Sequence, residues 1–354
     1  MDIVLLIGSL AIILVAAEHF TNGIEWFGHK LNLAEGAVGS VLAAVGTALP
    51  ETMIPLVAIL LASGMADPSA GHDIGVGAIL GAPFMLATLA MFVTGLGVLA
   101  YRHRRTSGSR MPVDTKVLGM DIRYFFLAYA IAVGAALVPP ELSWLRYVAV
   151  VALIGIYAWY VKAHFQSDTS IDAVDLSPLR FRRVDRLAFR TDPSGAPRLR
   201  VVNFQVLVAL GMIIGGAFVF VDAVEHLAAS AGLDPVLLAL IIAPIATELP
   251  EKFNSLLWVR RGKDTLAMGN ITGAMVFQSC IPTAIGVVLA ADAWTISSGS
   301  LLSFASAGIA FLSTAAIFLP MVRRGSLNGR HLLVGGLFYV LYVALVIARL
   351  GGII

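Results

Sequence analysis

Two copies of one short motif decide the fold of this chain: Val45-Gly46-Thr47-Ala48-Leu49-Pro50-Glu51 and Ile245-Ala246-Thr247-Glu248-Leu249-Pro250-Glu251. Their Thr, Leu, Pro and Glu recur at a spacing of 200 residues. A second pair of similar segments follows them, at 77–82 and 269–274. Such an internal repeat predicts that the chain consists of two related halves.

The sequence around the motifs is typical of a membrane protein. Of its 354 residues, 58% are hydrophobic and 13% are charged, and the mean hydropathy is +0.89. The apolar segments are continuous, not alternating, and this favours helices over a β-barrel. We predict an all-α polytopic fold with about ten spans of about 20 residues or more: Ile3–Phe27, Ala34–Ala62, Ile74–Leu99, Gly119–Val138, Trp144–Ala163, Val202–Ala229, Pro235–Val259, Thr265–Leu289, Leu301–Val322 and His331–Ala348.

Lys and Arg gather in alternate loops. The basic loops contain Lys30 and the stretches 102–116, 162–200, 260–263 and 323–330. The loops between them have no Lys or Arg: 63–73, 139–143, 229–234 and 291–298. The positive-inside rule then predicts that the basic loops are cytoplasmic and that both termini lie on the outer side of the cell membrane. Because the basic residues are concentrated in these loops and the net charge is only +2, nothing indicates nucleic acid as a partner.

The repeat and the loops together divide the chain into three parts. Residues 1–164 form a first five-helix repeat with the motif Gly-Thr-Ala-Leu-Pro-Glu, residues 165–200 form a basic cytoplasmic linker, and residues 201–354 form a second five-helix repeat with Ala-Thr-Glu-Leu-Pro-Glu. Five is an odd number, so the second repeat is expected to enter the membrane inverted. The linker is either a hinge that carries topological charge or a regulatory segment.

Each motif places a carboxylate, Glu51 or Glu251, in the middle of an apolar span. A charge at that depth costs at least about 2.5 kcal/mol, so these residues should face a cavity, an ion or a partner. The competing interpretation is a pair of Pro-kinked helices whose Glu side chains simply bond to neighbours. We favour a functional role for both residues.

Hard oxygen donors surround each Glu of the motifs. The Pro of each motif has no N–H for the carbonyl four residues earlier, which belongs to Gly46 in the first copy and to Ala246 in the second. Thr47 and Thr247 lie one helical turn before the Glu. Such oxygens suit Ca²⁺ or Na⁺ as transported ions, and no cofactor is expected.

The two segments resemble the α-repeats of the cation/Ca²⁺ exchanger superfamily, which includes the sodium/calcium exchangers. The family pattern is Gly-Thr-Ser-Leu-Pro-Glu, followed one helix later by Gly-Ser-Asn-Ile-Phe-Asn/Asp. The resemblance implies a cation antiporter with alternating access, not an enzyme, whose partners are the lipid bilayer and inorganic cations. By position, Glu51 and Glu251 would be the central Ca²⁺ ligands, and Thr47 and Thr247 would be further ligands.

The sequence differs from this family pattern at several positions and therefore resembles a divergent member of the superfamily. Ala48, Ala82 and Ala274 stand where the family has Ser, and Leu86 and Gln278 stand where it has Asn or Asp. Leu86 has no oxygen, whereas Gln278 keeps an amide oxygen that can bind a cation. Several Na⁺ ligands of the family are therefore missing, and the counter-ion stays open between Na⁺ and H⁺.

Glu248 takes the place of the second motif's Ser and lies three residues before Glu251. Two neighbouring carboxylates can bind a divalent cation when ionised and carry a proton otherwise. The alternative is that Glu248 pairs with a basic residue or points to water.

Two other classes of function remain: a cation channel, and an intramembrane enzyme on a transporter-like scaffold. The sequence has no His-Glu-x-x-His zinc motif and no pair of Asp-rich motifs. A channel differs from an antiporter in needing no ion on the opposite side of the membrane.

Overall fold

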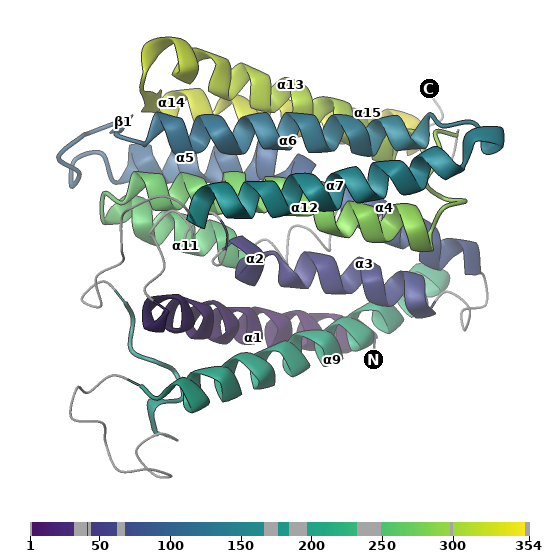
Figure 1. The fold of residues 1–354 in the computed structure, drawn as a ribbon, viewed down its shortest axis with the longest axis horizontal. Helices are drawn as coiled ribbons and strands as arrows, with labels where there is room; N and C mark the ends of the chain where they lie inside the picture. The colour runs from purple at the N-terminus through teal and green to yellow at the C-terminus, as the bar shows by residue number, and fades with distance from the viewer. Residues whose placement is uncertain are drawn as a thin grey trace.

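A computed structural model describes residues 2–31, 41, 44–61, 68–165, 176–183, 197–231, 249–297 and 300–350. This part of the chain is nearly all helical (Figure 1), and eight of its helices are long and apolar enough to cross a membrane. The predicted all-α polytopic fold is confirmed. Two of the ten predicted spans, Ala34–Ala62 and Pro235–Val259, lie partly outside the described residues.

The elements before the linker are α1 (Asp2–Lys30), α2 (Ala44–Thr47), α3 (Leu49–Leu61), α4 (Pro68–Met85), η3 (Leu86–Ala90), α5 (Met91–Ala100), β1 (Arg110–Met111), α6 (Thr115–Ala136), η4 (Pro140–Leu142) and α7 (Trp144–Phe165). Those after it are α9 (Leu199–Ala231), α11 (Leu249–Arg260), α12 (Asp264–Leu289), α13 (Leu301–Arg324), β2 (Leu327–Asn328), α14 (Gly329–Leu332) and α15 (Val334–Leu350).

The helix α1 packs along α9 on one side of the bundle, below α2 and α3 in Figure 1. Two glycines permit this close approach. A Cβ atom on Gly23 would lie 2.7 Å from Cγ2 of Val206, and one on Gly216 would lie 2.7 Å from Cγ1 of Ile13. Small residues at such contacts let helix backbones approach each other where no aqueous hydrophobic effect drives association.

The linker segment 176–183 docks onto this helix pair. The indole N–H of Trp26 donates to the carbonyl of Ser177 at 2.9 Å, and Oδ1 of Asn22 accepts from the backbone N–H of Arg180 at 3.0 Å. From α9, Oε1 of the buried Gln205 accepts from the backbone N–H of Phe181 at 2.8 Å. These bonds satisfy polar groups that would otherwise be costly to bury.

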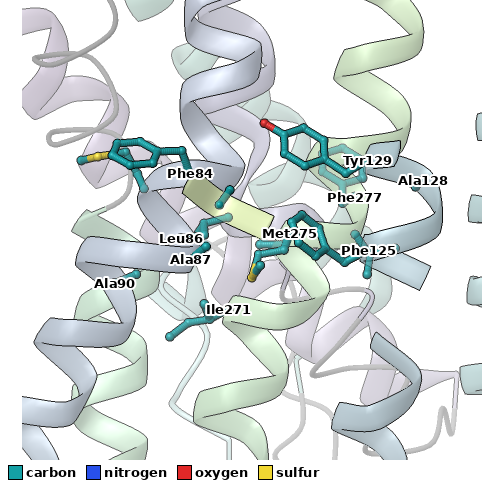
Figure 2. Packing of buried hydrophobic residues seen from close by; sticks show 14 of the residues in the cluster. Phe84, Leu86, Ala87, Ala90, Phe125, Ala128, Tyr129, Ile271, Met275 and Phe277 are labelled. Carbon is teal, nitrogen blue, oxygen red and sulfur yellow. The ribbon is translucent and has the colours of Figure 1, made fainter. Parts of the chain in front are cut away.

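The main core lies where α4 and η3 meet α6 and α12. Figure 2 shows Phe84 and Leu86 on one side of this contact and Phe125 and Met275 on the other. The hydroxyl of the fully buried Tyr129 donates to the carbonyl of Leu80 at 3.0 Å, so an aromatic side chain can fill the core without leaving a polar atom unsatisfied.

Two local features differ from uninterrupted helices. The π-helical turn η3 begins at Leu86, within the predicted third span, and such turns concentrate at functional sites. A two-residue antiparallel ladder, β1 with β2, pairs Arg110 with Asn328 and Met111 with Leu327. Hydrophobic periodicity cannot predict so short a ladder, because it joins loops more than 200 residues apart.

A buried ion pair stabilises the end of the molecule that carries the β1–β2 ladder. The guanidinium of Arg105, in the loop after α5, bonds both carboxylate oxygens of Asp264 at the start of α12, at 2.8 and 2.6 Å. Arg105 also donates to the carbonyls of Val259, Gly108 and Arg110. Both charged side chains are almost fully buried, at 1% and 0% exposure.

Candidate ion-binding site

The first motif lies at a helix break. The helix α2 ends at Thr47, Ala48 forms a turn, and α3 begins at Leu49. Pro50 occupies the first turn of α3, where its missing N–H costs little. Glu51 is in the same turn, 5% exposed, and the positive end of the helix dipole favours a carboxylate there.

The carbonyl of Ala48 is the polar centre of this break. It accepts the backbone N–H of Thr52 at 3.2 Å and the hydroxyl of Thr52 at 2.9 Å. A third donor, Nε2 of Gln278 on α12, lies 3.2 Å away. The structure thus brings Gln278, a predicted ligand from the second half, to the first motif.

Gln278 is fully buried, and within the described residues its Oε1 makes no hydrogen bond. An amide oxygen without a donor in an apolar interior is destabilising unless it meets another partner. A cation one turn from Glu51 would be such a partner. The role of Gln278 as a cation ligand stays a prediction.

The rest of the predicted ligand set is described only in part. The backbones of Gly46 and Thr47 belong to α2, and that of Glu251 lies in the first turn of the described part of α11. The side chains of Thr47 and Glu251, and the whole of residues 246–248, lie outside what the structure describes. The roles of Ala246, Thr247 and Glu248, and the approach of Glu251 to Glu51, stay predictions.

The departures from the family pattern are buried in the core. Leu86 is 2% exposed at the start of η3, and Ala82 and Ala274 are fully buried. None of these three side chains has an oxygen. Within the described residues, no group of three or more His, Cys, Asp or Glu side chains is placed to hold a metal ion.

Sequence reasoning missed one charged residue beside the second motif. Lys252 is 5% exposed in α11, directly after Glu251. In the sequence it is the only Lys or Arg between residues 201 and 259, and an ionisable residue within a predicted span indicates function. In the sequence it lies four residues after Glu248, the spacing at which charged side chains pair along a helix.

Helices long enough to span a bilayer, arranged around a buried carboxylate at a helix break, define a polytopic membrane protein with a polar site in its core. The chain matches the sodium/calcium exchanger protein family over residues 1–164 and 203–351. It belongs to this family.

Individual relatives agree with this membership. The chain is 23% identical over 325 residues to the putative antiporter CaxA of Alkalimonas amylolytica, covering 90% of this chain and 89% of that one. Its fold matches the crystal structure of the H⁺/Ca²⁺ exchanger CAX, with a TM-score of 0.74, 16% identity and coverage of 98% and 82% of the two chains. It also matches the sodium–calcium exchanger NCX_Mj, with a TM-score of 0.62, 16% identity and 97% coverage of both chains.

We predict that Gln278→Leu weakens cation binding about 10-fold, the lower end of the loss seen when a supporting group is removed from a metal site. The change removes both the free Oε1 and the donor to Ala48. The affinity for transported Ca²⁺, measured as half-saturation of uptake, reports the effect. Ser279→Ala is the matched control, because within the described residues the Ser279 hydroxyl donates to the carbonyl of Met275 in its own helix, at 2.7 Å. Equal affinities for the two variants would contradict the role of Gln278.

Proposed function

We propose that this protein is a membrane antiporter that exchanges Ca²⁺ for protons by alternating access. The observation that carries the proposal is the buried carboxylate of Glu51 at the α2–α3 break, three residues after Ala48, whose carbonyl accepts the amide of Gln278. Family membership supports cation exchange as the general activity. Glu251, at the equivalent position of the second motif, would supply the second carboxylate.

Two carboxylates at one site explain how the fluxes are coupled. Glu51 and Glu251 carry two negative charges when ionised, and these balance one divalent cation or two protons. Ca²⁺ and protons then compete for the same oxygens, so each must leave before the other binds. Thr47, Thr247 and the carbonyls of Gly46 and Ala246 would complete a set of hard oxygen ligands.

The chemistry of the surrounding residues favours protons over Na⁺ as counter-ion. A Na⁺ ion needs several oxygen ligands of its own, and the buried side chains of Leu86, Ala82 and Ala274 have no oxygen. A proton needs only a carboxylate. The titratable Glu248 beside Glu251 adds a candidate carrier that the usual Ser would not.

The membrane arrangement is part of the proposal. Two inverted five-helix repeats, 1–164 and 201–354, would be joined by the cytoplasmic linker 165–200, with both termini outside. The two segments that match the family leave out 165–202, and this supports the division.

If Glu248 carries the proton, Glu248→Gln should flatten the pH dependence of Ca²⁺ transport, because Gln cannot titrate. An unaltered pH profile would exclude Glu248 as carrier. The variant Glu248→Gln/Lys252→Met separates this from a structural role: if Glu248 mainly neutralises Lys252, the single variant should lose folded yield and the double variant should regain it.

Uptake of labelled Ca²⁺ into proteoliposomes tests the function itself. Vesicles are loaded with acid, with Na⁺, or with the external buffer. We expect uptake only into acid-loaded vesicles. Uptake driven by a Na⁺ gradient would show that the counter-ion is Na⁺ and not the proton. Uptake without any counter-gradient would indicate a channel. Absence of Ca²⁺ flux in every condition would reject Ca²⁺ as the substrate.

A further inference from the structure

A cavity of about 320 Å³ lies between the first turn of α7 and the C-terminal end of α12. The turn from α6 to α7, which contributes to it, is at the end of the molecule opposite β1 (Figure 1). None of the residues that line the cavity belongs to the ligand set of the proposed ion site. Its volume is within the range of small-molecule sites, about 300–1,000 Å³.

Arg146 supplies a positive charge to this cavity, and within the described residues no carboxylate forms an ion pair with it. Its Nη1 donates to the carbonyl of Ala291 at 2.7 Å, and its Nη2 donates to the carbonyl of Val138 at 3.3 Å. Each of these nitrogens carries a second N–H. Arg146 is partly buried in the first turn of α7, where the helix dipole opposes a cation and favours an anion.

Asp292 supplies a negative charge to the same cavity. The described residues place no Lys, Arg or His in an ion pair with it, and it does not pair with Arg146 across the cavity. It follows the end of α12 at Leu289, and the carbonyl end of a helix favours a cation. The cavity thus holds one unpaired charge of each sign, and a ligand that carries both an anionic and a cationic group would compensate the two.

The location of the cavity favours a lipid as this ligand. It lies where α7 begins and α12 ends, and both helices are long and apolar enough to cross a membrane. Trp144 and Tyr147 are 58% and 64% exposed there, and these residue types are enriched at the level of lipid headgroups. The lining residue Val288 and the next turn of α7 at Val148 expose apolar surface that acyl chains can cover.

We propose that this cavity binds the headgroup of a zwitterionic phospholipid with a primary ammonium group, phosphatidylethanolamine. The phosphate would accept from the second N–H groups of Arg146 and from the hydroxyl of Ser143 at the start of α7, and guanidinium groups bind phosphate with charge-assisted hydrogen bonds. The ammonium would donate to the carboxylate of Asp292. It would also donate to the hydroxyl of Thr295, whose own proton is directed to the carbonyl of Asp292 at 3.1 Å.

Thermal unfolding of the purified protein in detergent with added lipid tests this proposal. The added lipids are phosphatidylethanolamine, phosphatidylcholine, whose ammonium has no N–H, and phosphatidylglycerol, which has no ammonium. A ligand of the folded state raises Tm by mass action. We expect phosphatidylethanolamine to raise Tm by at least about 3 °C more than the other two lipids at the same mole fraction.

Three variants place this difference at the cavity. Arg146→Gln and Asp292→Asn should each abolish the advantage of phosphatidylethanolamine. The matched control is Glu141→Gln, because Glu141 is exposed in η4 beside the cavity but does not line it, and this variant should keep the full difference. Asp292→Asn leaves both carbonyl contacts of Arg146 in place, so it decides the matter if Arg146→Gln does not fold.

Equal shifts with all three lipids, or a full difference in Asp292→Asn, would overturn the proposal. An equal or larger shift with phosphatidylglycerol would show that an anion alone suffices and would reject the zwitterionic ligand. Water-soluble phosphoethanolamine distinguishes the source of the headgroup: a shift as large as that of the lipid would reject the membrane as the source. The readout does not depend on transport, so failure of the proposed function would leave this site standing.

Discussion

Replacing Glu51 by Gln should reduce Ca²⁺ uptake by about 100-fold or more. Even residues that only support metal ligands typically contribute about 10- to 100-fold, and Glu51 is proposed to touch the ion. The amide keeps the size and one oxygen but removes the negative charge, so the loss reports charge and not packing. Initial rates of uptake into acid-loaded proteoliposomes measure it.

The control for this prediction is Glu141→Gln, the same chemical change in the exposed η4 turn. It should transport as the wild type does. Glu51→Asp keeps the charge but shortens the side chain, and we expect it to retain more activity than Glu51→Gln. Transport by Glu51→Gln at the rate of Glu141→Gln would show that the first motif does not bind the ion.

Asp264→Asn should lower the free energy of unfolding by about 3–5 kcal/mol, because it leaves the buried guanidinium of Arg105 without its counter-charge. Both side chains are enclosed by protein, so solvent does not screen the pair. Unfolding of the purified protein in detergent, followed by denaturant titration, measures the loss. This contact joins the loop after α5 to the start of α12, and its removal should loosen that end of the bundle.

Arg104→Met is the matched control for removing charge from this loop, because Arg104 precedes Arg105 but is exposed. Its effect should be within about 0.5 kcal/mol. The variant Arg105→Met/Asp264→Leu removes both charges and should be more stable than the sum of the single changes implies. Additive losses would mean that Arg105 and Asp264 act independently.

Much of the fold could be predicted from local sequence. Spans such as α7 and α13 are continuous apolar segments close to the predicted bounds, because the hydrocarbon thickness sets both length and composition. The helix break at Ala48 lies two residues before Pro50, which has no N–H to donate to the carbonyl of Gly46. The resemblance to the exchanger pattern also singled out Gln278, whose contact with Ala48 crosses 230 residues.

Other features arise from tertiary pairing, and a single sequence contains no signal for them. Asp121 and His164 appear as separate polar residues in apolar spans, and only the packing of α6 against α7 brings them together. The ladder between β1 and β2 joins two loops, and each strand is too short to show alternation.

Lys252, in contrast, did carry a signal in the sequence, because it is the single Lys or Arg of its predicted span. The motif beside it drew attention to the carboxylates instead.

The most direct test of the central claim is a structure of the protein with bound Ca²⁺. The account predicts one Ca²⁺ at the α2–α3 break, with carboxylate oxygens of both Glu51 and Glu251 at about 2.3–2.6 Å. A Ca²⁺ ion held by ligands from only one of the two motifs, or bound away from Glu51, would contradict it.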